Sequence, residues 1–381
     1  MKKKWLSILL ALSMLICLIP TGVFAEDGAA TGIAAIQFGT RNISGPTKTT
    51  VDGKGDYWTP NSYIYFGVNS ENNSIPIKWR VLDAEKANDG TTNGMFLLSE
   101  YLLASGVQFY SDYSKGNVYQ GSDAQAWCSS FATDTSNFSA AEQAAMLGIA
   151  KHDIAENNVE NYLYLGLWGE SNLTVNDKLF FLSAREVADY IGNYYHAPGL
   201  AATEAAQKRA GVWWLRSPSK EVTYACVVTV DELVTVRTVS DPWKTRPALN
   251  VDTDSVLFIS AAEGSKPDGG LQPVSQNYTG NEWKLTLSDN SRSDFLARST
   301  DVFAFTKGGT VEISYNYAKT GANEYISALI MDEVGNPIYY GRSNAPLTEQ
   351  NGTAQLTIPA GFAEGTYTLM VFNEQYNGDY K

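Results

Sequence analysis

The residues best suited to bind a ligand lie in two short motifs rich in tryptophan and arginine. One runs from Gly211 to Pro218 (GVWWLRSP) and the other from Thr245 to Asp252 (TRPALNVD). Flat aromatic rings can cover the apolar face of a sugar, and a guanidinium group offers five hydrogen-bond donors to hydroxyls or carboxylates. The candidate ligand-binding residues are Trp213, Trp214, Arg216, Trp243 and Arg246.

The same side chains also allow a structural interpretation. Successive side chains of a strand face opposite sides, so Trp213 and Trp214 cannot both enter one core. One ring is then buried, while the other covers a second layer or meets solvent. Arg216 and Arg246 stand beside turn-forming prolines, where they could tie loops to backbone carbonyls or carboxylates. A sugar-binding platform and an aromatic core with arginine ties both remain open.

No residue pattern predicts a catalytic centre. Lys151, His152 and Asp153 are adjacent, and adjacent residues do not converge as nucleophile, base and orienting group; a Gly-x-Ser-x-Gly elbow is absent. Carboxylates such as Glu156 and Glu160 are plentiful, but spacing alone cannot place two of them across a glycosidic bond. An extracellular glycan-active hydrolase is therefore the alternative to a non-catalytic binding protein.

Metal and cofactor sites are not predicted either. Calcium needs six to eight oxygen ligands. The best candidates for such ligands are Asp241 and the pair Asp252 and Asp254, but this pair more readily marks the end of a strand. Neither His152 nor His196 stands in a metal-binding spacing. Bound calcium thus has no support from a motif.

Two cysteines follow the N-terminal region, Cys128 and Cys226. A disulfide between them would close a loop of roughly 100 residues and could stabilise the fold by about 4–5 kcal/mol in the chain-entropy model. Two buried thiols that pack as small hydrophobic side chains are the other interpretation. The sequence leaves the pairing undecided.

The N-terminus indicates export. Lys2 to Lys4 precede an apolar run over residues 6–19, and small residues stand at Val23 and Ala25. This arrangement is typical of a secretory signal peptide, residues 1–25, cleaved after Ala25. No later run is long and apolar enough to span a membrane. We expect a secreted or cell-surface protein, and its net charge of −13 argues against nucleic-acid partners.

Alternating, β-branched and aromatic runs predict the strands, and capping signals predict the helices. Strands are expected at 36–39, 63–67, 77–82, 95–99, 212–215, 223–230, 233–239 and 248–258. Helices are expected at 123–131, 140–150, 184–192 and 201–210. Asp123 is expected to cap the first helix, and capping boxes at Ser139 and Ser183 open the next two. This order predicts an α+β domain over residues 26–260.

The remainder of the chain differs in composition. Residues 261–273 are rich in Gly and Pro and predict a linker. Short alternating strands separated by Gly and Asn turns follow, and they predict an all-β, immunoglobulin-like sandwich over residues 274–381. These strands are expected at 282–287, 301–306, 310–317, 326–331, 337–340, 353–358 and 366–373. The chain stops soon after the last of them, so we expect it to be part of a longer protein.

Six motifs of the first domain occur in an order that is similar to one known family. They are Trp79–Asp83, Phe96–Tyr101, Asp123–Cys128, Asp177–Ser183, Trp213–Pro218 and Arg246–Asn250. Over roughly residues 35–255 the chain resembles the DUF6273 domain of exported Gram-positive bacterial proteins. The resemblance implies an α+β fold distantly similar to the C-type-lectin-like fold, which formylglycine-generating enzymes also use. The C-terminal part is similar to the immunoglobulin-like modules of bacterial surface proteins.

The resemblance adds no chemistry by itself, because one fold hosts many functions. Formylglycine-generating enzymes use a nearby pair of reactive cysteines, whereas Cys128 and Cys226 fall in different segments and the latter in a predicted strand. We therefore expect a non-catalytic protein that binds a glycan or protein outside the cell, in the manner of an adhesin. A purely architectural module of a larger surface protein is the third possibility.

Overall fold

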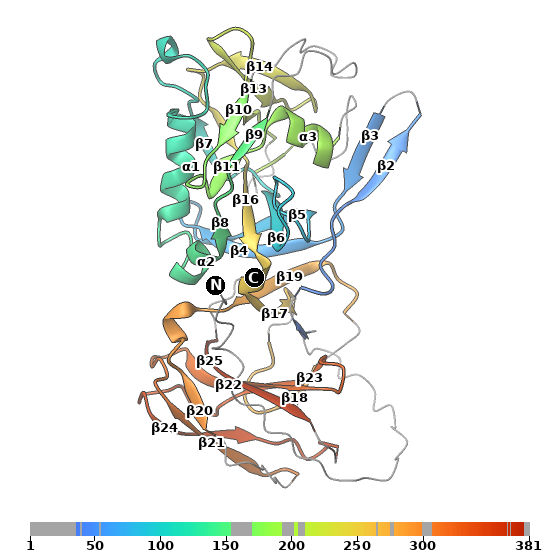
Figure 1. Cartoon of the computed structure of the whole chain (residues 1–381), viewed down its shortest axis with the longest axis vertical. Helices are drawn as coiled ribbons and strands as arrows, with labels where there is room; N and C mark the ends of the chain where they lie inside the picture. The colour runs from blue at the N-terminus through green and yellow to red at the C-terminus, as the bar shows by residue number, and fades with distance from the viewer. Residues whose placement is uncertain are drawn as a thin grey trace, which may run out of the picture. The chain divides into compact units, whose positions relative to one another are not determined.

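The chain forms two compact units in this computed structural model (Figure 1). We call Asn42–Ser255 the central unit, and Met1–Arg41 together with Val256–Lys381 the terminal unit. The structure describes residues 36–38, 40–52, 55–153, 170–192, 202–204, 210–263, 266–274, 278–298, 307–363, 365 and 367–376. The predicted signal peptide lies outside the described residues.

Two sheets build most of the central unit. The first has the strand order β4 (Tyr63–Asn69), β5 (Ile75–Asp83), β6 (Gly94–Ser99), β16 (Pro247–Asp252) and β11 (Leu179–Phe181), with β8 (Met146–Leu147) also on β16. The second has the order β14 (Val234–Thr238), β13 (Tyr224–Val228), β12 (Trp213–Pro218), β15 (Trp243–Thr245) and β7 (Ala104–Val107). Neighbouring strands are antiparallel except for the parallel pair β12 and β15.

Two small antiparallel pairs complete the strands of this unit. They are β2 (Thr47–Val51) with β3 (Gly55–Thr59), and β9 (Lys151–Asp153) with β10 (Ser171–Leu173). The hairpin of β2 and β3 projects from the side of the unit, and its inner end is held where the Trp58 amide donates to the carbonyl of Ile191 at 2.9 Å (Figure 1). The strands predicted around residues 63–67, 77–82 and 95–99 are confirmed as β4, β5 and β6.

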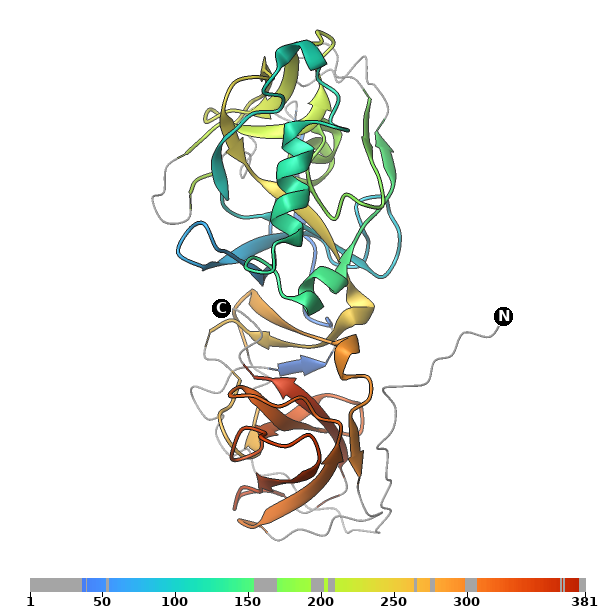
Figure 2. The same cartoon turned by 90° about the vertical axis from the view of Figure 1, so that its left-hand side faces the viewer.

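Three helices accompany the sheets: α1 (Asp123–Thr133), α2 (Ala140–Ala145) and α3 (Ala184–Tyr190). Both predicted capping boxes are confirmed, at Ser139 with Glu142 and at Ser183 with Glu186. The predicted cap of the first helix was wrong. Ser122 fills that position, and its hydroxyl accepts from the Gln125 amide at 3.0 Å. Helix α1 packs beside β11 and β7, and it faces the viewer in Figure 2.

Two other predicted elements differ from the structure. Most of the helix predicted at 201–210 lies outside the described residues, and Thr203 and Ala210 form a β-bridge rather than helical turns. The single strand predicted at 248–258 is two strands separated by the 3-10 turn Thr253–Ser255. The Asp252 carboxylate accepts from the Asp254 amide at 3.0 Å, and this local bond competes with a continuing ladder.

The terminal unit is built almost entirely of strands. One antiparallel sheet has the order β1 (Ile36–Phe38), β17 (Val256–Ala261) and β19 (Glu282–Leu287). A second has β18 (Gln272–Pro273), β23 (Pro337–Arg342), β22 (Glu324–Met331) and β25 (Thr368–Gln375). A third has β20 (Leu296–Arg298), β21 (Thr310–Asn316) and β24 (Gly352–Thr357), and a 3-10 turn spans Asn290–Arg292.

The second and third of these sheets share one apolar core. Ile313 of β21, Ile326 and Ile330 of β22, and Leu356 of β24 belong to a single buried cluster. Burial of apolar side chains from two sheets against each other stabilises a two-layer arrangement. Of the strands predicted after residue 273, the one at 301–306 lies outside the described residues, and the other six correspond to β19, β21, β22, β23, β24 and β25.

The boundaries between the units differ from the predicted domain limits of 26–260, 261–273 and 274–381. Strand β17 pairs with β1 and β19, so the terminal unit begins at Val256 and also takes residues before Asn42. The described part of 261–273 is packed rather than extended. A Cβ at Gly270 would lie 2.7 Å from the carbonyl oxygen of Thr357, and this close approach explains the glycine at that position.

A close approach of the same kind occurs in the central unit at Gly67, where the ladder of β4 and β5 shifts register. Its φ is +69°, and a Cβ there would lie 2.2 Å from the Phe138 ring. The Gly67 amide donates to the Glu142 carboxylate at 2.8 Å, which ties β4 to helix α2. Glycine therefore permits both the backbone conformation and the contact.

We expect the change Gly67→Ala to lower the free energy of unfolding by about 2–5 kcal/mol, because left-handed backbone strain adds to overpacking against Phe138. Gly90→Ala is the matched control: its φ is +88° and no atom lies within 4 Å of an added Cβ. The control should lose only about 1–2 kcal/mol from backbone strain. Urea titration followed by circular dichroism measures both, and equal losses would contradict the contact argument.

Candidate functional site

The two tryptophans of the first motif lie inside the central unit. Trp213 and Trp214 are both 0% exposed on the middle strand β12 of the second sheet. The indole N–H of Trp214 donates to the Val107 carbonyl at 2.7 Å, and its ring meets Phe109 edge-on at 5.5 Å. Both faces of this sheet are therefore covered, and neither ring offers a surface to a ligand.

Arg246 is also part of the core. It is 0% exposed, its Nε donates to the Ser99 carbonyl at 2.9 Å, and its guanidinium lies 5.1 Å from the Trp213 ring centre. Burial lowers the pKa of Arg246, and the charge of Arg80 acts in the same direction. Through the bond to Ser99, Arg246 links the start of β16 to the end of β6.

Arg216 belongs to a buried ion network. Its guanidinium donates to the Glu186 carboxylate at 2.5 Å, to the Phe181 carbonyl at 2.8 Å, and to the Asp153 carboxylate. Lys151 donates to the other oxygen of Glu186 at 2.7 Å. Because Lys151 and Asp153 alternate with the exposed His152 along β9, the charged pair turns inward while the histidine faces solvent.

Glu186 has no exposed side-chain surface and is held by further N–H donors. The Asn88 amide donates to it at 3.0 Å and the Ser183 backbone at 2.9 Å. Burial by itself would raise the pKa of Glu186, but Arg216 and Lys151 outweigh burial and lower the pKa to about 2. The carboxylate is thus ionised, saturated with donors and closed to any substrate, which is a structural role.

Trp243 is the one predicted site residue that keeps partial exposure. It lies on β15 and pairs with Val107 of β7. The structure therefore brings Trp213, Trp214, Arg216 and Arg246 into the interior and leaves Trp243 half-buried on β15. The platform that these five side chains were predicted to form is not present as an accessible surface.

The cysteines are two free, buried thiols. Burial raises the pKa of Cys226 to about 12 and raises that of Cys128 further. The thiolate is the reactive form of cysteine, and a raised pKa suppresses it. Among the described residues, no three His, Cys, Asp or Glu side chains are grouped so that they could hold a metal ion.

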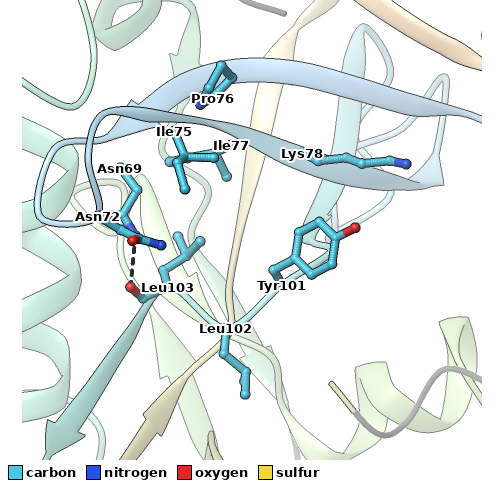
Figure 3. A pocket seen from close by; sticks show the side chains of 9 residues that line it. All are labelled: Asn69, Asn72, Ile75, Pro76, Ile77, Lys78, Tyr101, Leu102 and Leu103. Atoms are coloured by element: carbon cyan, nitrogen blue, oxygen red, sulfur yellow. Dashed lines mark hydrogen bonds between the residues drawn. The ribbon is translucent and has the colours of Figure 1, made fainter. Parts of the chain in front are cut away.

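A small pocket opens between the turn that joins β4 to β5 and the segment after β6 (Figure 3). Figure 3 shows Asn69 and Asn72 at one end and Tyr101 and Lys78 at the other, with apolar side chains between them. The full lining is Asn69, Asn72, Ile75, Pro76, Ile77, Lys78, Tyr101, Leu102 and Leu103.

Asn69 gives this pocket its chemical character. The side chain is 4% exposed, and its amide N–H donates to the Leu103 carbonyl at 2.8 Å. Its Oδ1 is buried and has no hydrogen-bond partner among the described residues. A buried acceptor without a donor is costly, so a donor from outside would be favoured there.

The walls of the pocket are held by backbone bonds. The Leu102 and Leu103 amides donate to the carbonyls of Thr203 and Thr245 at 2.9 and 3.0 Å. The opposite wall is a turn in which Asn73 and Ser74 take positive φ values of 55° and 53°. Groups held by hydrogen bonds before a ligand arrives lower the entropic cost of binding.

Sequence reasoning missed this pocket because its residues form no motif. The run from Asn69 to Ser74 is an asparagine-rich connection between the strands predicted at 63–67 and 77–82. Only the pairing of Asn69 with Leu103 shows that one of those asparagines is buried.

In its described residues the central unit is thus a β-rich fold with three short α-helices. Residues 92–253 match the family described as a domain of unknown function, DUF6273. Over this range the match confirms the resemblance noted in the motifs. Comparison with curated proteins and with solved structures found no match. No helix in the described ranges is long and apolar enough to cross a membrane.

We expect Trp213→Ala to lower the free energy of unfolding by about 3–5 kcal/mol, because it leaves a large cavity in a closed core. Tyr113→Ala is the control, since that side chain is 62% exposed and its loss should cost within about 0.5 kcal/mol. Denaturation followed by circular dichroism measures both. A stable Trp213→Ala protein that had lost ligand binding would restore the binding interpretation.

The ion network predicts an acid-dependent stability. Because its pKa falls from an unfolded value near 4.5 to about 2, Glu186 stabilises the fold fully above pH 4.5 and progressively less as the pH drops toward 2. Glu186→Gln leaves Arg216 and Lys151 with Asp153 as the one carboxylate of the network and should cost about 3–5 kcal/mol at neutral pH. Denaturation series run from pH 7 to pH 3 should show the difference in free energy of unfolding between the two proteins becoming smaller. A difference that does not change with pH would refute the role of the Glu186 charge.

Proposed function

We propose that this chain is an exported, non-catalytic protein that binds a glycan or protein ligand outside the cell through the central unit. The single observation that carries the proposal is the pocket beside Tyr101, with the buried acceptor of Asn69 left open to a donor. The basic and apolar N-terminal run supports secretion or display at the cell surface.

Binding is favoured over hydrolysis by the chemistry of the lining. A glycoside hydrolase needs two carboxyl groups across the scissile bond. No carboxylate is among the nine residues that line the pocket. The buried carboxylates Glu186 and Asp153 are engaged with Arg216 and Lys151 instead. The lining can therefore orient and hold a ligand, and it offers no acid–base pair to cleave one.

The proposal includes the finer fold assignment. A central unit of antiparallel sheets with capped helices is compatible with a distant C-type-lectin-like fold. The two sheets of the terminal unit that share a core are compatible with an immunoglobulin-like sandwich, which would act as a spacer or second contact surface. In lectin-like folds the irregular loops carry the ligand site, and here the pocket lies at such a loop.

A protein ligand has a separate observation in its favour. Four apolar side chains are strongly exposed on three loops of the central unit: Tyr113, Val118, Val175 and Val222. Asn117 joins two of these loops by donating to the Ser219, Glu221 and Tyr224 carbonyls at 2.7–3.0 Å. Gln120 joins the third by donating to the Asn172 carbonyl at 2.9 Å. Exposed apolar groups that gather in this way mark contact surfaces.

The test is binding of residues 26–381 to an array of glycans and cell-wall polymers, with calcium and with a chelator. We expect a hit that does not depend on calcium, because the pocket offers no carboxylate ligand for the ion. Tyr101→Leu should abolish this hit, while Tyr113→Leu, the same change at an exposed loop, should leave it intact. If Tyr113→Leu alone abolishes the hit, binding belongs to the exposed apolar loops. If the array shows no hit and no protein ligand is captured either, the proposal is refuted.

A further inference from the structure

We propose that Lys266 and Glu374 of the terminal unit condense with each other into an amide bond. The bond joins the segment after β17 to β25, the last strand that the structure describes. The inference is independent of ligand binding by the central unit, because both residues belong to the terminal unit. It follows from the contact between the two side chains, from the aromatic rings around that contact and from a hydroxyl that donates to the carboxylate.

The two side chains form a buried pair. The Lys266 ammonium donates to Oε1 of Glu374, and the two side chains are 2% and 4% exposed. They stand 108 positions apart in the chain, so the fold and not the local sequence brings them together. Groups that a fold holds in contact can react with effective concentrations of about 10⁵–10⁸ M, because the entropic cost of their meeting is already met.

Three aromatic rings surround the ammonium. Its Nζ lies 5.6 Å from the ring centres of Phe258 and Tyr376 and 6.0 Å from that of Tyr340. The Tyr376 hydroxyl donates to the Lys266 backbone carbonyl at 2.9 Å, which keeps this ring beside the pair. Phe258 and Tyr340 belong to a buried apolar cluster. Such surroundings exclude water, which is both the product of the condensation and the reagent that would reverse it.

Tyr340 supplies the third group of the reaction. Its hydroxyl donates to Oε2 of Glu374 at 2.6 Å, so the two carboxylate oxygens have different partners. Oε1 faces the ammonium and is placed to take its protons. Oε2 faces a hydroxyl donor, which stabilises negative charge on that oxygen when the carboxyl carbon is attacked.

The step transfers two protons from Nζ to Oε1. The first transfer turns the ion pair into an amine and a carboxylic acid, and the loss of both charges is favoured where water is excluded. The lone pair of Nζ then attacks Cδ, and the π electrons of the C–Oε2 bond move to Oε2, where Tyr340 donates. When these electrons return, the C–Oε1 bond breaks and Oε1 leaves with the second proton as water. One ammonium and one carboxylate thus give one amide and one water, and no oxidant or reductant takes part.

A second lysine–glutamate pair shows which condition matters. In the central unit Lys151 donates to Glu186 at 2.7 Å. Burial alone would raise the pKa of Glu186, but Arg216 and Lys151 lower it to about 2. A carboxylate held in its ionised form by two cations does not take the proton that condensation requires. We therefore expect the Lys151–Glu186 pair to stay ionic.

The bond would give the terminal unit a covalent link between distant segments. Both cysteines that the structure describes are free, so they supply no such link. An amide between residues 266 and 374 restricts the unfolded chain in the way that a disulfide closing a loop of similar length does. A protein that works outside the cell gains resistance to unfolding from such a link.

The experiment is mass spectrometry of purified residues 26–381, before and after proteolytic digestion. We expect an intact mass that is lower than the sequence mass by one water molecule. Digestion should yield a branched peptide that contains both Lys266 and Glu374. Fragmentation of this peptide assigns the lost water to the pair and not to cyclisation of the N-terminal Glu26.

Two variants test the roles of the groups, with circular dichroism to check that each is folded. Lys266→Arg should yield no branched peptide, because a guanidinium stays protonated and does not attack the carboxyl carbon. Tyr340→Phe keeps the ring and should slow the appearance of the branched peptide by about 10²–10³-fold, the loss typical of removing one such donor. Samples taken at intervals after synthesis measure this rate.

Lys151→Arg is the matched control, because it makes the same change in the other pair and should leave the branched peptide intact. A wild-type chain with its full sequence mass and no branched peptide overturns the inference, and so does a branch that joins Lys151 to Glu186 instead. No ligand enters this experiment, so its outcome is separate from that of the glycan array.

Discussion

A carboxylate sealed from water stays ionised only where cations and N–H donors replace its hydration. Glu186 meets this condition because Arg216 comes from β12, Lys151 from β9 and Asn88 from the turn after β5. The charge thus requires four segments, distant in sequence, to meet at one point. Removing any one cation would leave an uncompensated buried charge, so the network constrains the layout of the central unit.

The same constraint explains why the family motifs are rich in tryptophan and arginine. Arginine keeps its charge in almost any surroundings and satisfies several acceptors in fixed geometry. Arg216 accordingly donates to the Glu186 carboxylate. Arg246 donates to the Ser99 carbonyl, with its guanidinium beside the Trp213 ring. Large rings around these groups exclude water and strengthen the bonds. Residues that resemble a binding platform in the sequence therefore form the support of the fold.

The pocket owes its existence to the same framework. The segment after β6 is fixed by bonds to Thr203 and Thr245, so the Leu103 carbonyl occupies a set position to which Asn69 must donate. One amide cannot satisfy both its donor and its acceptor there. The unsatisfied acceptor of Asn69 is locally destabilising, and the ordered surroundings hold it in place. Destabilising features of this kind often occur at functional sites. Of the six motifs, Phe96–Tyr101 contributes one residue, Tyr101, to the lining of the pocket.

The sequence by itself determined the local elements. Capping boxes at Ser139 and Ser183 and the alternating strands were predicted because neighbouring residues decide them. Only the tertiary structure decided that Trp213 is enclosed on both faces, that the chain turns after Asp252, and that Asn69 is buried with an open acceptor. Burial depends on segments far apart in sequence, and local periodicity carries no information about which of them will meet.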